Sequence, residues 1–397
     1  MPAFLPQNAD VVLRAMQYRD LDAIAQLAAD TAGFDGLGNP LDPSGVDWSR
    51  LRTWYGISTI LGSLAPAHRR LRASVAERDR RICGAIAVGP VNQSRSTWSV
   101  KQVAVMPEGR RQGIGSELLR YCFETIWEAR TWMLEVNVHG KDALALYRHN
   151  GFQPLAQLTY WTIAPSVLAS LAEREPDLPN LMPVGNADAP LLYQLDTAAM
   201  PPHVRQAFDR RVDDFKVNWL SALSGTRQRM DGLETTMGYV FEPQRKAAIG
   251  YFQVRSNRYD PQPHGVELTV HPAYTWLYPE LMAQIARIAR SVNPELPVIL
   301  ASADYQPERE AYLEGIEAER FEHSLLLSRS VWHKLRETRS MSLDALHEML
   351  NGWQPAKPMT GGGRVYWSQA WDGQAIDWPD DPIEPTDLPD SPPQPQG

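Results

Sequence analysis

The sequence predicts an α/β (α+β) fold that occurs twice along the chain. Over the first 163 residues, segments with strand character alternate with amphipathic helical segments, which is typical of helices packed on a central sheet. A similar succession returns about 165 residues later, with short matches in sequence. A chain of 397 residues is also long enough for two or three domains of ordinary size.

The first copy begins with a predicted strand at Leu13–Met16 and an amphipathic helix at Asp20–Ala29. After the mixed segment Thr31–Arg70, two runs of β-branched and apolar residues at Leu71–Ala76 and Ile82–Val88 predict a hairpin. The elements expected next are a strand at Thr97–Val105, a helix opened by Gly113 and Gly115, a strand at Met133–Val138, a helix at Asp142–His149 and a closing segment of strand character at Gly151–Ile163.

The helix after the two glycines has the clearest periodicity. Its apolar residues recur at intervals of three and four and form one face, namely Leu118, Leu119, Cys122, Phe123, Ile126 and Trp127. The chain has two cysteines, Cys83 and Cys122, so a disulfide framework and a four-cysteine zinc site are both excluded. We expect Cys122 to be a reduced core residue.

The internal repeat rests on several matches with nearly constant spacing. VAVMP at 103–107 matches LTVHP at 268–272, and Tyr147 matches Tyr312, both 165 residues apart. Near the two beginnings, Asp20 matches Asp188 at a spacing of 168. We therefore expect two copies of one fold, in domains at 1–170 and 178–336, followed by an extension at 337–397 whose acidic, proline-rich end is predicted to be disordered.

Charge and hydropathy narrow the classes of partner. The net charge is −8, but seven acidic residues and no basic residue follow Trp371, so the rest of the chain is close to neutral. No basic stripe indicates nucleic-acid binding, and no apolar stretch is long enough to span a membrane. Because the first residues also lack the pattern of a signal peptide, we expect a cytoplasmic protein.

The segment VAVMPEGRRQGIGSELL at 103–119 is the strongest local motif. A strand leads through a turn with Gly113 and Gly115 directly into an amphipathic helix. Glycine permits positive φ and a close approach of the backbone to a ligand. The first amides of a helix and the positive end of its dipole favour an anion, so the motif predicts a pyrophosphate site, although a tight turn without a ligand is the plainer alternative.

The wider pattern resembles the GNAT N-acetyltransferase superfamily. The sequence Arg-x-x-Gly-x-Gly at Arg110, Gly113 and Gly115 is similar to the acyl-CoA loop of that family. ALALYRHNGF at 143–152 resembles its second signature, a Leu-Tyr pair on a helix before Gly-Phe. The resemblance implies two tandem GNAT-like domains, each with a mixed, mostly antiparallel central sheet flanked by helices. It also implies acetyl-CoA or another acyl-CoA as co-substrate, without a metal.

The resemblance also implies roles for individual residues. Tyr147 would protonate the leaving thiolate, because a tyrosine with its ordinary pKa of about 10 suits a thiol leaving group. An amide of the strand before the loop would polarise the thioester carbonyl. The residues expected to bind the acyl-CoA are Val103, Ala104, Val105, Arg110, Arg111, Gln112, Gly113, Ile114, Gly115 and Ser116.

No carboxylate marks the general base at its usual place. Members of the family often carry an acidic residue on the strand before the loop, but Lys101 and Gln102 stand there. His139 and Glu135 remain as candidate catalytic bases, and each has a plainer alternative as an exposed or structural residue. Gly140 replaces a frequent asparagine, so one contact in the CoA channel is expected to be missing.

The second copy appears without the phosphate loop. At a spacing of 165, Tyr278 and Glu280 take the places of Gly113 and Gly115. Their side chains would block a phosphate, and the carboxylate would repel it. We expect a degenerate second domain that serves as scaffold or as part of the acceptor site, with Tyr312 as a structural residue.

The acceptor is expected to lie under the segment 31–70, where Trp48, Trp54 and Tyr55 form an aromatic cluster that suits either a substrate pocket or core packing. The predicted function is transfer of acetyl from acetyl-CoA to a primary amine of a small molecule, peptide or protein by direct attack. The alternatives are a peptide-modifying or longer-chain acyltransferase and a non-catalytic module that senses acyl-CoA. The sequence predicts neither the acceptor nor the oligomeric state.

Overall fold

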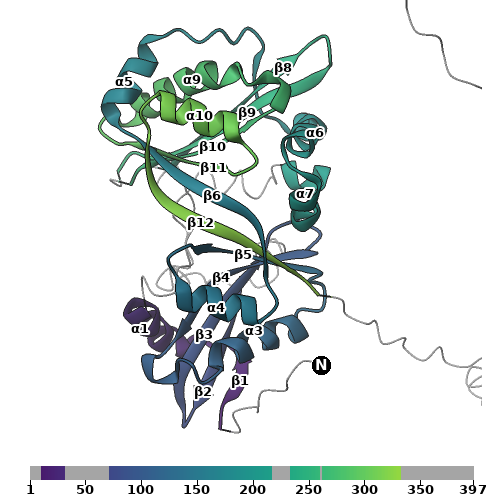
Figure 1. Ribbon diagram of the computed structural model, residues 1–397, viewed down its shortest axis with the longest axis vertical. Helices are drawn as coiled ribbons and strands as arrows, with labels where there is room; N and C mark the ends of the chain where they lie inside the picture. The colour runs from purple at the N-terminus through teal and green to yellow at the C-terminus, as the bar shows by residue number, and fades with distance from the viewer. Residues whose placement is uncertain (1–9, 32–70, 217–232, 260–261, 332–397) are drawn as a thin grey trace, which may run out of the picture. The chain divides into compact units, whose positions relative to one another are not determined.

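The computed structural model describes residues 10–31, 71–216, 233–259 and 262–331, which belong to one compact unit. Their strands form a single twelve-stranded sheet in the order β1-β2-β3-β4-β5-β12-β6-β11-β10-β9-β8-β7 (Figure 1). Most neighbouring strands are antiparallel, and the pairs β4–β5 and β10–β11 are parallel. The predicted mixed, mostly antiparallel sheet with flanking helices is confirmed.

The first half of the sheet carries the elements that the sequence predicts, within one to three residues at most ends. They are β1 (Val12–Ala15), η1 (Tyr18–Asp20), α1 (Leu21–Thr31), β2 (Arg72–Arg78), β3 (Arg81–Pro90), β4 (Thr97–Val105), η3 (Pro107–Gly109), α3 (Ile114–Thr125), β5 (Thr131–Asn137), α4 (Lys141–His149), β6 (Gln153–Ile163) and α5 (Pro165–Glu173). Figure 1 shows this succession in purple to teal.

The second half repeats the succession. Its elements are β7 (Leu181–Pro183), η4 (Asn186–Asp188), α6 (Ala189–Ala199), α7 (Pro202–Phe208), η5 (Val212–Phe215), β8 (Leu233–Glu242), β9 (Ala247–Asn257), β10 (His264–Val270), η6 (Pro272–Tyr274), α9 (Leu277–Val292), β11 (Val298–Ala303), α10 (Pro307–Gly315) and β12 (Glu319–Ser330). No helix among the described residues is long and apolar enough to cross a membrane.

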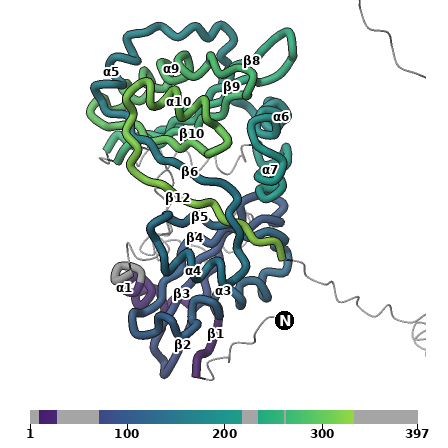
Figure 2. Tube along the Cα trace, in the orientation of Figure 1, coloured from purple at the N-terminus to yellow at the C-terminus, as the bar shows by residue number. Residues whose placement is uncertain are grey.

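The strand order reads the same when the two repeats are interchanged. If each of the strands β1 to β6 is exchanged with its counterpart among β7 to β12, the same order is obtained, read from the other edge of the sheet. The last strands have changed places, because β12 lies between β5 and β6, and β6 lies between β12 and β11 (Figure 2). Each repeat therefore completes the sheet of the other.

Irregularities in the exchanged strands obey the same symmetry. The register of β12 with β6 skips Phe321 on one strand and Leu155 on the other, 166 positions apart. Asn137 of β5 faces Ser324 of β12, and the corresponding pairing of β11 with β6 sets Ala303 opposite Leu158. The repeat predicted from the sequence is therefore present in the fold, with a spacing of 166 in this part.

The parallel strands of each repeat separate after a short contact. In the first repeat, β4 pairs β5 over Thr97–Ser99 only, and the rest of β4 is registered with β3 alone. In the second repeat, β10 pairs β11 over His264–Val266. Strands that part in this way open a slot in the sheet, bordered by backbone groups.

A β-bulge marks the slot of the first repeat. Val88 faces Val100 and Ala87 faces Gln102, so Lys101 is the extra residue in β4. The register of β10 with β9 runs without such a shift. Because bulges bend a strand and are frequent next to active sites, the bulge distinguishes the first slot from the second.

Helices cover both faces of the sheet. Successive residues of β3 point to opposite faces of the sheet and contribute to separate cores. Ile86 and Val88 pack under α3 and α4, and Ala85 and Ala87 pack under α1. The second repeat has a corresponding core under α9 and α10. Trp127, expected on the buried face of α3, lies beyond its last residue and is 74% exposed, because the helix ends at Thr125. Both cysteines are free and buried, as predicted for Cys122.

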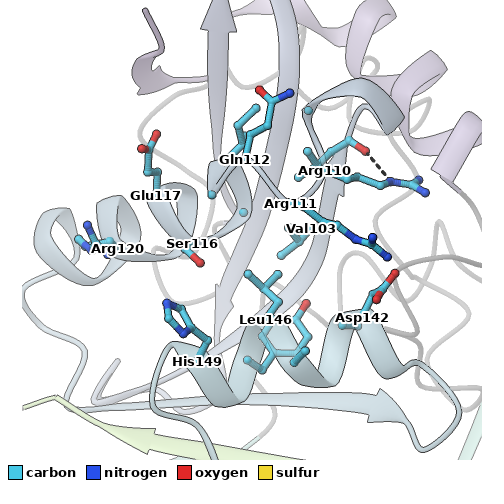
Figure 3. Close-up of a pocket in the computed structure, with 18 residues that line it drawn as sticks. Val103, Arg110, Arg111, Gln112, Ser116, Glu117, Arg120, Asp142, Leu146 and His149 are labelled. Atoms are coloured by element: carbon cyan, nitrogen blue, oxygen red, sulfur yellow. Dashed lines mark hydrogen bonds between the residues drawn. The ribbon is translucent and has the colours of Figure 1, made fainter. Parts of the chain in front are cut away.

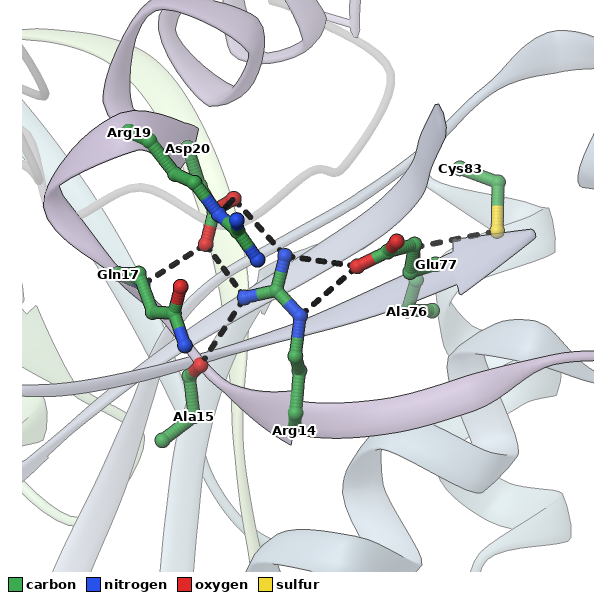
Figure 4. Close-up of polar contacts among 8 residues, drawn as sticks. All are labelled: Arg14, Ala15, Gln17, Arg19, Asp20, Ala76, Glu77 and Cys83. Carbon is green, nitrogen blue, oxygen red and sulfur yellow. Dashed lines mark hydrogen bonds and ion pairs between the residues drawn. The ribbon is translucent and has the colours of Figure 1, made fainter. Parts of the chain in front are cut away.

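Asp20 and Asp188 confirm the predicted match near the two beginnings. Asp20 accepts a hydrogen bond from the Gln17 amide at 2.7 Å, and Asp188 accepts one from the Gly185 amide at 2.8 Å. Asp20 is buried and also accepts from Arg14, which pairs with Glu77 as well (Figure 4). The Arg14 guanidinium holds the pKa of Asp20 below its ordinary value.

Candidate active site

A cavity of about 610 Å³ lies between the outer part of β4, the loop after η3, and the helices α3 and α4 (Figure 3). Its size is typical of a site for a small molecule or cofactor. The lining residues are Val103, Val105, Gly109, Arg110, Arg111, Gln112, Gly113, Ile114, Gly115, Ser116, Glu117, Arg120, Asp142, Ala143, Ala145, Leu146, Tyr147 and His149. Nine of the ten residues predicted to bind the carrier are among them.

The tenth predicted residue, Ala104, has its side chain on the other face of β4. It is fully buried in the core under α1, whereas Val103 and Val105 point to the cavity side. This is the normal alternation of a strand. Only the backbone of Ala104 is therefore in a position to serve the site.

The loop before α3 has the backbone geometry of an anion cradle. Arg111 has a φ of 62° and Gly113 a φ of 86°, and α3 begins at the next residue, Ile114. The first amides of a helix have no carbonyl of that helix to bind, and a left-handed residue before them turns several amides in one direction. The sequence prediction of a turn with positive φ at Gly113 is confirmed.

Basic side chains from two elements surround the cavity. Arg110 and Arg111 come from the loop, and Arg120 comes from α3 (Figure 3). Arg110 donates to the carbonyl oxygen of Val105 at 3.4 Å. Glu117 and Asp142 also lie on the rim, so the charge is mixed. Arg120, Asp142 and Glu117 were not identified from the sequence, since only the helical spacing of α3 and α4 brings them to this opening.

Tyr147 lines the cavity and is almost completely buried. The residue is 1% exposed, and its ring contacts that of Phe152 edge to face, with centroids 5.8 Å apart. The preceding residue, Leu146, packs against Gly115, where a Cβ would come within 3.1 Å of a Leu146 methyl carbon. The absence of a side chain at Gly115 thus keeps α3 and α4 close while the cavity stays open.

Glu135 is on β5, on the face of the sheet opposite the cavity. Its neighbours Leu134 and Val136 pack in the core under α3, and the alternation of the strand turns Glu135 to the other side. The hydroxyl of Tyr160 donates to its carboxylate at 2.5 Å. Burial raises the pKa of Glu135 to about 7, against the hydrogen bond from Tyr160, which lowers it.

His139 has a different environment. It lies exposed in the turn after β5 and is not among the residues that line the cavity. Its backbone amide donates to the Asn137 side chain at 2.9 Å. Trp48, Trp54 and Tyr55, the predicted acceptor cluster, lie outside the described residues.

The second repeat lacks the cradle for a different reason from the one expected. Two residues, Thr275 and Trp276, separate η6 from α9, and both are right-handed; four residues separate η3 from α3. Gly250 faces Leu277 and Leu281 as Gly84 faces Ile114 and Leu118. Trp276 and Tyr278 therefore correspond to Gly113 and Gly115, and the predicted pairing of Tyr278 with Gly113 was wrong by two residues because the loop is shorter.

The match of Tyr312 with Tyr147 was also wrong, by one residue. Phe152 donates its amide to the Tyr147 carbonyl after α4, and Ala318 donates to the Leu313 carbonyl after α10. Leu313 thus corresponds to Tyr147, and both are 1% exposed. The extra residue of the bulge in β4 and the shorter loop change the spacing between the repeats locally. A constant offset of 165 therefore does not give the correct partner at every position.

Side chains of the second repeat occupy the places that border the cavity in the first. Tyr278 stacks on Tyr312, with centroids 6.0 Å apart, where the first repeat has Gly115 and Leu146. Arg309, at the position of Ala143, donates to the carbonyl oxygens of Leu268 on β10 and Ala301 on β11. The guanidinium therefore bridges the two separated strands.

Glu280 is buried at the start of α9 and is already engaged. Its carboxylate accepts from the Asp177 amide at 2.8 Å and pairs with Arg174. It fixes the segment that follows α5. At the spacing of 163 in this helix, Glu280 corresponds to Glu117 of the first repeat, so the predicted match of Glu280 with Gly115 was also wrong by two residues.

The family model for the GNAT acetyltransferase domain matches residues 69–154. This range includes β2 to β5, the loop, α3 and α4, and therefore the whole lining of the cavity.

Two solved structures are similar to this chain. A tandem GNAT protein from the clavulanic acid biosynthesis pathway is 17% identical, with a TM-score of 0.52 over 82% of this chain and 99% of that one. A GCN5-related N-acetyltransferase from Sphaerobacter thermophilus is 15% identical, with a TM-score of 0.49 over 82% of this chain and 97% of that one. No curated protein sequence matches the chain.

Proposed function

Since the chain is a tandem-domain protein of the GNAT superfamily, we propose that its first repeat transfers an acyl group, most simply acetyl, from acyl-CoA to a primary amine. The observation that carries this proposal is the cavity between the slot of β4 and the cradle before α3. We assign catalysis to 1–170, a supporting role to 178–336, and no catalytic role to 337–397.

The cavity offers a suitable group for each part of the carrier. The amides of residues 111–116 suit the pyrophosphate, and Arg110, Arg111 and Arg120 supply positive charge. The backbone of Val103 and Val105, which β5 leaves unpaired, suits the amides of the pantetheine arm. This arrangement would direct the thioester into the slot, next to the bulge at Lys101.

The chemistry needs a base and an acid on the two sides of the sheet. Glu135 takes a proton from the acceptor ammonium, and the neutral nitrogen attacks the thioester carbonyl, forming the C–N bond. Collapse of the tetrahedral intermediate breaks the C–S bond. The thiolate takes the hydroxyl proton of Tyr147. The tyrosine then regains a proton from the former amine nitrogen, which loses its second proton in this step. We prefer Glu135 to His139 as base because it is partly buried on β5 beside the slot, whereas His139 is exposed in a turn.

The test uses the full chain with acetyl-CoA and a panel of primary amines, including lysine-containing peptides. We expect release of free thiol with at least one amine, together with a mass increase of one acetyl group on that amine. Binding of acetyl-CoA without turnover of any amine would favour the acyl-CoA sensor instead. Absence of binding by calorimetry would refute the proposed function as a whole.

A further inference from the structure

A polar cluster surrounds Glu135 on the face of the sheet opposite the cavity. It consists of Glu135 and Asn137 on β5, Tyr160 on β6, and Glu322 and Ser324 on β12. Tyr160 and Ser324 are at most 1% exposed, so two hydroxyl groups are held in the interior of the sheet. Their partners are the carboxylates of this cluster.

The exchange of strands brings the second repeat into this cluster. Because β12 lies between β5 and β6, Ser324 comes next to Glu135, and its hydroxyl group lowers the pKa of that carboxyl group. Glu322 accepts from the Asn137 side chain at 3.2 Å and from the Ser324 hydroxyl at 3.5 Å. Two residues that are far from the first repeat in sequence therefore contact its candidate base directly or through one intermediate.

The equivalent place in the second repeat contains no such cluster. At the spacing of 166 that the two bulges define, Ala301 corresponds to Glu135, Leu326 to Tyr160, Leu158 to Ser324 and Ala156 to Glu322. All four counterparts are apolar. The polar cluster thus occurs beside the slot that has the bulge and the cavity, and the slot that Arg309 bridges has apolar residues instead.

We propose that the second repeat completes the acceptor side of the first repeat's active site, with Ser324 and Glu322 of β12 and Tyr160 of β6 as positioning residues that orient Glu135 and set its affinity for the acceptor's proton. This inference rests on the proposed function. It gives the second repeat a role in the reaction that does not require binding of a second carrier.

The neighbours of Glu135 shift the pKa of its carboxyl group in different directions. The hydrogen bond from Tyr160 and the nearby hydroxyl group of Ser324 stabilise the carboxylate and lower its pKa, whereas the negative charge of Glu322 raises it. Lys101 on β4 lowers it as well. Burial is the largest contribution and raises the pKa of Glu135 to about 7, where a carboxylate can both accept and release a proton at neutral pH.

The first experiment follows the carboxyl group of Glu135 in the full chain by infrared spectroscopy as a function of pH. The band of the protonated acid is identified by its loss in Glu135→Gln. We expect titration near neutral pH, a downward shift of the midpoint in Glu322→Gln and an upward shift in Ser324→Ala, each on the order of half a pH unit to one unit. Opposite shifts are not expected from general loosening of the sheet.

Glu319→Gln is the matched control, because it removes an exposed carboxylate from the same strand outside the cluster. It should leave the midpoint unchanged. Equal midpoints in the wild type, Glu322→Gln and Ser324→Ala would overturn the proposal. A carboxyl group of Glu135 that titrates at its ordinary pKa would do the same.

The second experiment uses the amine identified in the panel above. The acid limb of the profile of kcat/KM against pH should move in the same direction as the infrared midpoint in each variant, while the Kd for acetyl-CoA stays within about twofold of the wild type. Profiles that do not follow the infrared shifts would refute the positioning role. Because the infrared titration needs no turnover, its failure is distinguishable from failure of the proposed acyl transfer.

Discussion

Tyr278 stacks on Tyr312 in the second repeat, where the first repeat sets Gly115 against Leu146. The same helix pair therefore encloses a cavity in one repeat and two aromatic rings in the other. Arg309 adds to this difference, because its guanidinium binds carbonyl groups on both strands of the slot. Both repeats have kept the same helices and strands, but the cavity between the helix pair and the separated strands is present in the first repeat and filled by side chains in the second.

We expect Ala143→Arg to weaken binding of acetyl-CoA to the first repeat. Arginine at this position would fill the slot as Arg309 does in the second repeat, so the affinity should fall by at least about tenfold, or about 1.4 kcal/mol. Isothermal calorimetry on the full chain measures the effect, with a stoichiometry of one carrier per chain in the wild type.

Arg309→Ala is the reciprocal control. It should leave the affinity of the first site unchanged, because Arg309 contacts β10 and β11 rather than β4 and β5. A loss of affinity in Arg309→Ala equal to that in Ala143→Arg, or a stoichiometry of two in the wild type, would contradict the assignment of the carrier to the first repeat.

Gly113→Ala should weaken binding through the backbone alone. No atom lies within 4 Å of the added Cβ, but the φ of 86° is unfavourable for a residue with a side chain. A cost of roughly 1–2 kcal/mol predicts a loss of affinity of roughly 5- to 30-fold. Gly315→Ala in α10 is the control, because the added Cβ also meets no atom within 4 Å but the φ of Gly315 is not positive. It should leave the affinity for acetyl-CoA unchanged. Equal acetyl-CoA affinities in the two variants would argue against the cradle.

Tyr147→Phe should lower kcat on the order of 100-fold, because the ring stays packed while the proton donor is lost. The Kd for acetyl-CoA should change by less than about twofold, since the ring still makes its contact with Phe152. Tyr312→Phe should have no effect on kcat. Unchanged kcat in Tyr147→Phe would assign the protonation of the thiolate to another group.

The sequence predicted the local features well and the long-range ones poorly. The loop with Gly113 and the hairpin of β2 and β3 are encoded within a few neighbouring residues. The exchange of β6 and β12 depends on pairing between strands that are more than 150 residues apart. Hydrophobic patterns report which face of a strand is buried and do not indicate which distant strand it pairs with. For the same reason the environment of Glu135 could not be recognised before the fold was known.

The local shifts of the repeat explain the wrong matches. The bulge at Lys101 adds one residue to β4 and the loop before α9 is two residues shorter than the loop before α3, so the spacing falls from 166 to 163; α9, with 16 residues against 12 in α3, is longer, and the spacing is 166 again at α10. A single offset of 165 therefore paired Tyr312 with Tyr147 and Tyr278 with Gly113. Hydrogen bonds at the helix ends give the correct partners, since they depend on the geometry rather than on the count of residues.

The raised pKa of Glu135 also has a consequence for stability. A carboxyl group whose pKa is about 7 in the folded protein and lower in the unfolded chain stabilises the fold at low pH, and this contribution is lost as the pH rises through 7. Glu135→Gln removes the dependence. We expect its Tm relative to the wild type to be higher at pH 8 than at pH 5, by roughly 2–4 °C per kcal/mol. A Tm difference that is independent of pH would contradict the raised pKa.

Separation of the repeats should show how far each depends on the other. In a fragment of residues 1–170, β5 would lack β12 as its neighbour and would present an unpaired edge. Because β6 and β12 are equivalent in the repeat, β6 of a second fragment can take the vacant place, which is a domain swap. We expect a dimer of the fragment by light scattering, and a monomeric fragment with an intact sheet would mean that β6 can pair with β5 of its own repeat.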